Sequence, residues 1–197
     1  MLSEKEKYIE LFKNSINSFV NVSDETFEQL VKIGKFKSVG KRELIILKEQ
    51  IAKKIYFVCK GILISKWIDH EGNVHIKNFF IEGNLAGSTV SMLQQTPSAF
   101  SIESITEGVI IEMDYQQYKT LIFNSEELKN FYIAYLEQKW VIENEKRQIS
   151  FAAQSATERY LTFQNDFPGL ENRVAQHIIA LYLGITPTQL SRIRKKL

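Results

Sequence analysis

The sequence predicts an α+β protein in three parts: a β-sandwich or barrel, a long helix, and a C-terminal helix-turn-helix. Three observations support this. From Phe36 to about Met113 the chain consists of short runs rich in Ile, Val, Phe and Tyr. Residues 124–153 have apolar side chains at helical spacing. Residues 176–195, QHIIALYLGITPTQLSRIRK, have small, apolar and capping residues at the spacings that a helix-turn-helix needs.

Composition narrows the class of protein. Of 197 residues, 44% are hydrophobic and 24% are charged, which is typical of a soluble globular chain. No apolar run is long enough to span a membrane, and the charged stretch MLSEKEKYIELFKNSI lacks the apolar core of a signal peptide. The single cysteine, Cys59, lies in the apolar stretch YFVCKG, which favours core packing over a reactive thiol. We therefore expect a cytoplasmic protein with no membrane partner.

Positive charge gathers toward the C-terminal end. The net charge of the whole chain is +2. Residues 171–197 hold five basic residues and one acidic residue, a net charge of +4, so the remaining 170 residues carry −2. If the protein binds a polyanion, we expect the contact in this C-terminal part.

The chain is predicted to begin with two amphipathic helices, and a series of strands follows them. The first helix is indicated by apolar residues at helical spacing, and the second is ETFEQLVKI, which follows Ser23. The predicted strands are ELIILKE, KKIYFVCKG, ILISKWID, VHIKNFFIEG, AFSIESITE and GVIIEMD. Between the third and fourth of them, DHEGN carries Gly72 and Asn73, a hairpin signal.

Helices return after the strands. DYQQYKTLIF predicts a short helix, and residues 124–153 predict a long one with Asn124 as N-cap and Glu127 at the third position. Ser155 and Glu158 form a capping box that opens the next helix, which Pro168-Gly169 ends. We therefore divide the chain into a first domain at 1–123, a long helix at 124–153 and a C-terminal helical domain at 154–197; the resemblance described below implies a sensor, a dimerisation and a DNA-binding role for them in that order.

The long helix carries an apolar seam suited to pairing with a second copy of itself, although two lysines interrupt it. The predicted dimer contacts are Leu128, Tyr132, Tyr135, Ile142 and Ile149. The alternative is that the helix packs along its own β domain, using Phe131, Leu136 and Trp140 on another face. Both arrangements can hold at once.

The C-terminal stretch fits a helix-turn-helix residue by residue. Ala180 is small where the two helices cross, and Gly184 suits the left-handed residue of the turn. Thr186 can cap the second helix, Pro187 is favoured at its first position, and Gln189 completes a capping box. Apolar residues that would close the corner are Ile179, Leu183, Ile185, Leu190 and Ile193.

The exposed face of the second helix suits the major groove of DNA. Thr188, Arg192 and Lys195 lie at positions i, i+4 and i+7, where arginine can bond guanine and lysine can neutralise phosphate. The expected DNA-contacting residues are Arg173, Thr186, Thr188, Gln189, Ser191, Arg192, Lys195 and Lys196. The alternative is a solvated basic helix that closes a small bundle.

This order of parts, and above all ERYLTFQNDFPGLENRVAQHIIALYLGITPTQLSRIRKKL, resembles the Crp/Fnr family of bacterial transcription regulators. The resemblance covers nearly the whole chain and is strongest to short regulators of Bacteroidetes-type bacteria. It implies a cyclic-nucleotide-binding-like β jelly-roll (double-stranded β-helix) sensor, a homodimer joined by the long helix, a palindromic double-stranded DNA operator and contact with RNA polymerase. It also implies that Arg192 reads bases, while Thr188 stands where the family often has glutamate.

Two further features of the family differ here. Many members continue with a β-hairpin wing, so a chain ending at Leu197 is expected to contact fewer phosphates and to depend less steeply on salt. The family's phosphate-binding cassette, Gly-Glu-Leu followed by Arg-Ser or Arg-Thr, is altered. The corresponding candidate effector-binding residues are Gly83, Asn84, Leu85, Ser98 and Ala99.

The altered cassette argues against cyclic AMP. No arginine lies between Arg42 and Arg147 to clamp a cyclic phosphate, and Lys66 or Lys77 would offer charge only at a different site. One cysteine does not suit an iron–sulfur cluster, and the three histidines lack metal-ligand spacing. We therefore expect no metal and no cofactor, and the effector stays open.

The leading prediction is a sequence-specific DNA-binding transcription regulator without catalytic activity, because the sequence has no Gly-rich phosphate loop and no nucleophile paired with a base. The alternative is a ligand-binding or protein-interaction module with a vestigial helix-turn-helix.

Overall fold

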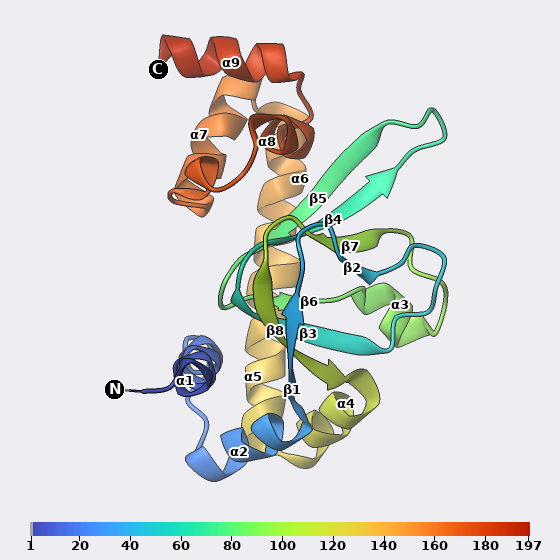
Figure 1. The fold of residues 1–197 in the computed structure, drawn as a ribbon, viewed down its shortest axis with the longest axis vertical. Helices are drawn as coiled ribbons and strands as arrows, with labels where there is room; N and C mark the ends of the chain where they lie inside the picture. Colours follow the sequence, from blue (N-terminus) through green and yellow to red (C-terminus); the bar gives the residue numbers. More distant parts are fainter. Residues whose placement is uncertain (1) are drawn as a thin grey trace.

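The computed structural model describes residues 2–197 and consists of an antiparallel β-sandwich with helices at both ends (Figure 1). The sheets have the strand orders β1-β8-β3-β6 and β2-β7-β4-β5. The first strand pairs with the last, the second with the seventh, the third with the sixth and the fourth with the fifth. Such nested pairing is that of a jelly roll. The strands are β1 (Lys35–Val39), β2 (Leu44–Ile46), β3 (Lys54–Lys60), β4 (Leu63–Ile68), β5 (Val74–Phe80), β6 (Leu85–Ala86), β7 (Ser101–Ser104) and β8 (Gly108–Asp114).

The predicted strands are present, and the structure adds two more strands and a helix. Strand β1 alternates Lys, Phe and Ser at the edge of its sheet, so it lacks the apolar run that marks a buried strand. Strand β6 has two residues, which is too short to produce any periodicity. Helix α3 (Thr89–Gln94) has six residues and no side-chain cap.

Capping side chains define most of the helix starts. Helices α1 (Glu4–Asn17) and α2 (Asp24–Ile33) begin after Ser3 and Ser23, whose hydroxyls accept hydrogen bonds from backbone amides of the first turn. Asp114 caps α4 (Tyr115–Asn124) in the same way. The predicted capping box of Ser155 and Glu158 opens α7 (Ala156–Asp166). After α7 come the short 3₁₀ turn Leu170–Asn172, α8 (Gln176–Leu183) and α9 (Pro187–Lys196).

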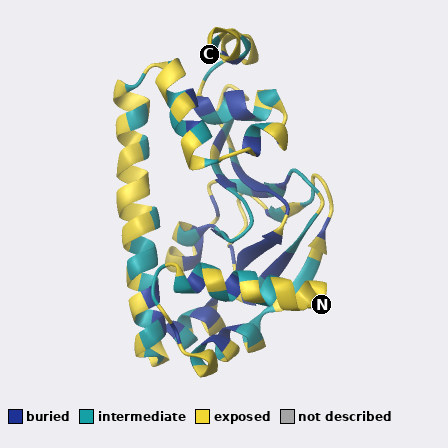
Figure 2. Ribbon diagram, turned by 90° about the vertical axis from the view of Figure 1, so that its left-hand side faces the viewer, coloured by how far each residue is buried: buried dark blue, intermediate teal, exposed yellow. Residues whose placement is uncertain are grey.

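The long helix, residues 126–153, runs beside the sandwich (Figure 2). It consists of α5 (Glu126–Leu136), a π-helical segment (Glu137–Ile142) and α6 (Glu143–Ala153). The predicted N-cap is wrong by one residue: the Ser125 hydroxyl accepts from the Leu128 amide at 3.3 Å, and Asn124 ends α4. Glu127 instead accepts a hydrogen bond from the Ser23 hydroxyl at 2.9 Å.

The π-helical segment divides the predicted dimerisation seam. Its backbone hydrogen bonds span five residues, as from the Glu143 amide to the Gln138 carbonyl. One extra residue in a turn rotates everything after it by about 100° relative to a regular helix. Leu128 is fully buried in its own core, and Tyr132 and Tyr135 pack against that core. Ile142 and Ile149 are exposed. The seam prediction is therefore wrong for Leu128, which has no surface left for a partner.

Two apolar cores hold the structure together. The first fills the sandwich and extends to α1, α2, α4 and α5 through residues such as Phe12, Phe57 and Phe131. The second joins the outer face of β4 and β5 to α7, α8 and α9. Its centre is Phe79, whose ring centroid lies 5.0 Å from that of Tyr182. No helix within residues 2–197 is long and apolar enough to cross a bilayer.

Candidate nucleic-acid interface

Helices α8 and α9 are joined by the tight turn that the sequence predicts. Gly184 ends α8 with φ 66° and ψ 36°, in the left-handed region that favours glycine. The Gln189 amide donates to the Thr186 hydroxyl at 3.1 Å, and the Thr186 amide donates to the Gln189 side-chain oxygen at 2.9 Å. Ala180 is fully buried where the helices meet. The order of small residue, turn and cap therefore follows directly from local sequence signals.

The two faces of α9 differ in burial. Leu190 is fully buried against α8, whereas Thr188, Arg192, Lys195 and Lys196 are exposed. Within residues 2–197, none of these three cations forms an ion pair, so their charges are available to a partner. Helix α9 lies at one end of the molecule (Figure 1), so its exposed face is not covered by the sandwich.

Three of the predicted DNA-contacting residues have another or a weaker role. The side chains of Thr186 and Gln189 form the cap of α9, so they position the helix. Ser191 is half-buried. The candidate contact surface is thus reduced to Thr188, Arg192, Lys195 and Lys196, which the structure brings to the exposed side of one helix.

The prediction that Arg173 contacts DNA is not supported by its position, because its side chain is bound to another residue. Its guanidinium donates two hydrogen bonds to Glu82, with N···O distances of 2.9 and 2.5 Å. Burial raises the pKa of Glu82, but the hydrogen bonds from Arg173 and from backbone amides outweigh that effect and hold the pKa below its ordinary value. Arg173 therefore ties the C-terminal helices to the turn after β5 and is not free to meet DNA in this conformation.

Three of the five candidate effector-binding residues, Gly83, Asn84 and Ser98, are hydrogen-bonded within the protein. The Asn84 side chain accepts from the Ile81 amide at 3.1 Å, and the Gly83 carbonyl accepts from the Ser15 hydroxyl at 2.6 Å. The Ser98 hydroxyl is buried; it donates to the Phe100 carbonyl and shares a second hydrogen bond with the Ser88 hydroxyl, for which it can act as the acceptor. Leu85 is buried in β6, and Ala99 is exposed. None of these five residues offers a charge to a ligand.

Sequence reasoning missed a contact between the long helix, β5 and α8. Arg147 of α6 donates to the Asn78 side chain at 2.7 Å and to the Ile76 carbonyl at 3.4 Å. Its guanidinium lies 4.6 Å from the centroid of the Tyr182 ring. No local signal marks Arg147, because its partners are about 70 residues earlier and 35 residues later in the chain.

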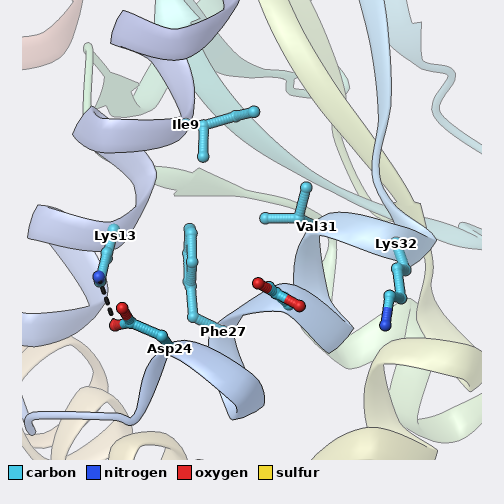
Figure 3. Close-up of a pocket in the computed structure, with 7 residues that line it drawn as sticks. Ile9, Lys13, Asp24, Phe27, Val31 and Lys32 are labelled. Atoms are coloured by element: carbon cyan, nitrogen blue, oxygen red, sulfur yellow. Dashed lines mark hydrogen bonds and ion pairs between the residues drawn. The ribbon is translucent and has the colours of Figure 1, made fainter.

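A shallow hollow lies between α1 and α2, at the end of the molecule opposite α9 (Figures 1 and 3). Its volume is about 380 Å³, and Ile9, Phe27 and Val31 supply its apolar lining. Lys13 and Asp24 form an ion pair of 2.6 Å at its edge. None of the predicted site residues lines it. Within residues 2–197, no three His, Cys, Asp or Glu side chains are grouped so that they could hold a metal ion.

Known proteins resemble this chain in structure. No protein-family model and no curated protein matches the sequence. The c-di-GMP-responsive global regulator CLP of Xanthomonas campestris is similar with a TM-score of 0.69 at 15% identity, over 88% of this chain and 91% of that one. FixK2 of Bradyrhizobium japonicum gives a TM-score of 0.69 at 19% identity, over 84% of each chain. A cyclic nucleotide-binding domain of Methylobacillus flagellatus gives 0.62 at 14% identity, over 75% of this chain and 83% of that one.

These neighbours are Crp/Fnr-type regulators and cyclic-nucleotide-binding domains, and the chain shares their fold. At such identities the likeness concerns the fold alone.

Proposed function

We propose that this chain is a sequence-specific DNA-binding transcription regulator of the Crp/Fnr type, acting as a homodimer on a palindromic operator. The observation that carries the proposal is α9, a capped helix docked through fully buried Leu190 with Thr188, Arg192 and Lys195 exposed. An α-helix with its side chains is about 10–12 Å across, which fits a major groove about 12 Å wide. In this reading α8 and α9 are a helix-turn-helix and α9 is its recognition helix.

The roles of the exposed side chains follow from their chemistry. Arg192 and Thr188 are exposed; an arginine can donate two hydrogen bonds to a guanine edge, and a threonine can contact a neighbouring base. Lys195 and Lys196 supply positive charge to phosphates, which sets affinity more than sequence preference. The proposal assigns the chain no catalytic role, and it includes RNA polymerase as a partner at promoters.

Dimerisation is proposed through the exposed apolar side chains of the long helix. Ile133, Val141 and Ile149 are 54%, 58% and 57% exposed, which is unfavourable for apolar residues facing water. Pairing the helix with a symmetry-related copy would bury them and present two α9 helices to half-sites about 34 Å apart. Ile149 is already in the predicted interface, and Ile133 and Val141 take the place of Leu128 in it.

DNA binding is tested by selecting bound sequences from a random duplex library and then measuring affinity by fluorescence anisotropy. We expect a palindromic site, and Arg192→Ala should lose about 1–3 kcal/mol of binding free energy and relax the preference at one base position. Arg42→Ala is the matched control, because Arg42 is also exposed but lies in the β domain. Equal affinities for the two variants, or no duplex bound by the dimer, would favour the ligand-binding or protein-interaction alternative.

The oligomeric state is tested separately by sedimentation. Ile149→Glu places a charge in the proposed interface and should convert the dimer to a monomer. Val90→Glu, on the similarly exposed Val90 of α3, should leave the dimer intact. A wild-type monomer at all concentrations would rule out the proposed assembly.

A further inference from the structure

The long helix is joined to the C-terminal helices through a short connection (Figure 2). Helix α6 ends at Ala153 and α7 begins at Ala156, so Gln154 and Ser155 lie between them. Both residues have extended backbone, with ψ 144° and 163°. Because each residue contributes two soft torsions, the connection alone does not fix the angle between the helices. Side-chain contacts across it are needed to do so.

One guanidinium spans this joint. Arg159, one turn into α7, donates to the Gln154 carbonyl at 2.8 Å and to the Leu183 carbonyl at 3.1 Å. Gln154 is the C-cap of α6, and Leu183 is the last residue of α8. Carbonyls at the C-terminal end of a helix lack a partner within the helix and carry partial negative charge, so a cation shared by two such ends stabilises both. Arg159 therefore connects α6, α7 and α8.

An aromatic ring of the long helix lies at the same joint. The Arg159 guanidinium is 5.4 Å from the centroid of the Phe151 ring. A methyl group added to Gly184 would lie 3.4 Å from Phe151 Cε1, so the ring is in van der Waals contact with the turn between α8 and α9. The end of α6 thus touches both the arginine and the turn from which α9 departs.

We propose that Arg159 is a positioning residue that fixes the angle between α6 and the α8–α9 pair, and thereby the spacing of the two DNA half-sites. A guanidinium that bonds two carbonyls in its rigid fork holds their direction as well as their distance. The part of the proposal that concerns DNA rests on the proposed function, in which paired long helices present two α9 helices to one duplex.

Half-site spacing is sensitive to this angle. One additional base pair moves one half-site by about 3.4 Å and rotates it by about 35° around the duplex. A rigid joint presents α9 in one direction and fits one spacing, whereas a loosened joint accommodates neighbouring spacings at similar free energy. The angle therefore determines specificity between operators whose half-site sequences are identical.

Other contacts attach the C-terminal helices elsewhere, so the loss of Arg159 should not unfold them. Arg147 of α6 stacks on Tyr182 of α8, and Arg173 is bound to Glu82 after β5. The core around β4 and β5 is also independent of Arg159. Arg159 differs from these contacts because it bonds the last residue of α8, immediately before the turn to α9.

The joint is tested without DNA by pulsed electron spin resonance. Spin labels are attached to Glu145→Cys on α6 and Arg194→Cys on α9, which are exposed positions, while buried Cys59 should stay unlabelled. An excess of unlabelled protein suppresses signals between protomers. We expect one narrow distance distribution when Arg159 is present, and a broader or displaced distribution in Arg159→Met.

Two further variants separate the bridging role from charge. Arg159→Lys keeps the positive charge, but a single ammonium lacks the fork that bonds both carbonyls, so it should not restore the narrow distribution. Arg42→Met removes an exposed arginine of the β domain and should leave the distribution unchanged. Circular dichroism confirms that each variant is folded at the temperature of measurement.

Spacing preference is then measured by fluorescence anisotropy on duplexes with the selected half-sites. Adding or removing one base pair between them should weaken wild-type binding by about tenfold, and Arg159→Met binding by less than about threefold. Both proteins should bind a single half-site with similar affinity, because the exposed side chains of α9 are unchanged. A purely structural role would instead lower affinity by the same factor at every spacing.

The proposal is overturned if Arg159→Met keeps the wild-type distance distribution, if Arg159→Lys restores it fully, or if affinity falls equally at every spacing. A joint that loosens in Arg159→Met, in a protein whose wild type ignores duplex DNA, would sustain the positioning role of Arg159 and refute only the proposed function.

Discussion

Phe79 offers the most direct test of how the C-terminal helices are attached. Its side chain is 4% exposed and lies among three rings, with centroid distances of 5.0 Å to Tyr182, 5.8 Å to Phe167 and 6.0 Å to Phe163. A buried phenylalanine removes roughly 150–200 Å² of apolar surface from water, which at about 25 cal/mol per Å² stabilises by about 4–5 kcal/mol. Measured core Phe→Ala substitutions cost about 3–5 kcal/mol. Phe79→Ala should therefore lower the free energy of unfolding by about 4 kcal/mol.

Urea unfolding followed by circular dichroism measures this loss, at one protein concentration for all variants. Hydrogen exchange of the α8 amides locates it, and these amides should lose protection in Phe79→Ala. Phe123→Ala is the control, because Phe123 is 57% exposed, and it should change stability by less than about 0.5 kcal/mol. A loss under about 1 kcal/mol for Phe79→Ala, or unchanged protection of α8, would refute the shared core.

Three further predictions follow from single residues. Gly184→Ala should cost about 1–2 kcal/mol in thermal unfolding, because alanine is strained at φ +66°, and the same change at Gly40, whose φ is not positive, should have little effect; equal effects would contradict this. Glu82 has a folded-state pKa below its ordinary 4.5, so its bond to Arg173 stabilises above that pH and is lost as pH falls through the folded pKa. As pH falls from about 5 to about 3, the free energy of unfolding measured in urea should decrease less for Glu82→Gln than for wild type. The same pH dependence of this free energy in both proteins would disprove the coupling. Burial raises the pKa of Cys59 to about 12, so Ellman's reagent at about pH 8 should label the thiol only after unfolding, and rapid labelling of native protein would contradict its burial.

The parts that sequence predicted well are those specified by neighbouring residues. The turn and cap between α8 and α9 are specified within four positions by Gly184, Thr186 and Pro187. They depend on local sequence and need no contact with distant parts of the chain. The capping box at Ser155 and the hairpin turn at Gly72 are equally local, and both are present.

The parts that sequence missed depend on residues far apart or on weak signals. Asn124 and Ser125 are both good caps, and the structure uses Ser125 because α4 continues through Asn124. The heptad spacing of Leu128, Ile142 and Ile149 predicts one face, but the π-helical segment, which lies between Leu128 and Ile149 and ends at Ile142, leaves no known mark in the residue pattern. The partners of Arg173 and Arg147 are supplied by β5 and the turn after it, which only the folded chain brings near.

The core that β4 and β5 share with α7, α8 and α9 limits how such a chain can be recombined. Cut between Gln154 and Ser155, the C-terminal piece would expose Ile179 and Leu183, and the sandwich would expose Phe79. Neither fragment should therefore behave as an interchangeable module. A chimera that joins the C-terminal helices to another sandwich must therefore also contain the β4–β5 hairpin of this chain. The hairpin and the C-terminal helices together form the smallest segment set that keeps this core.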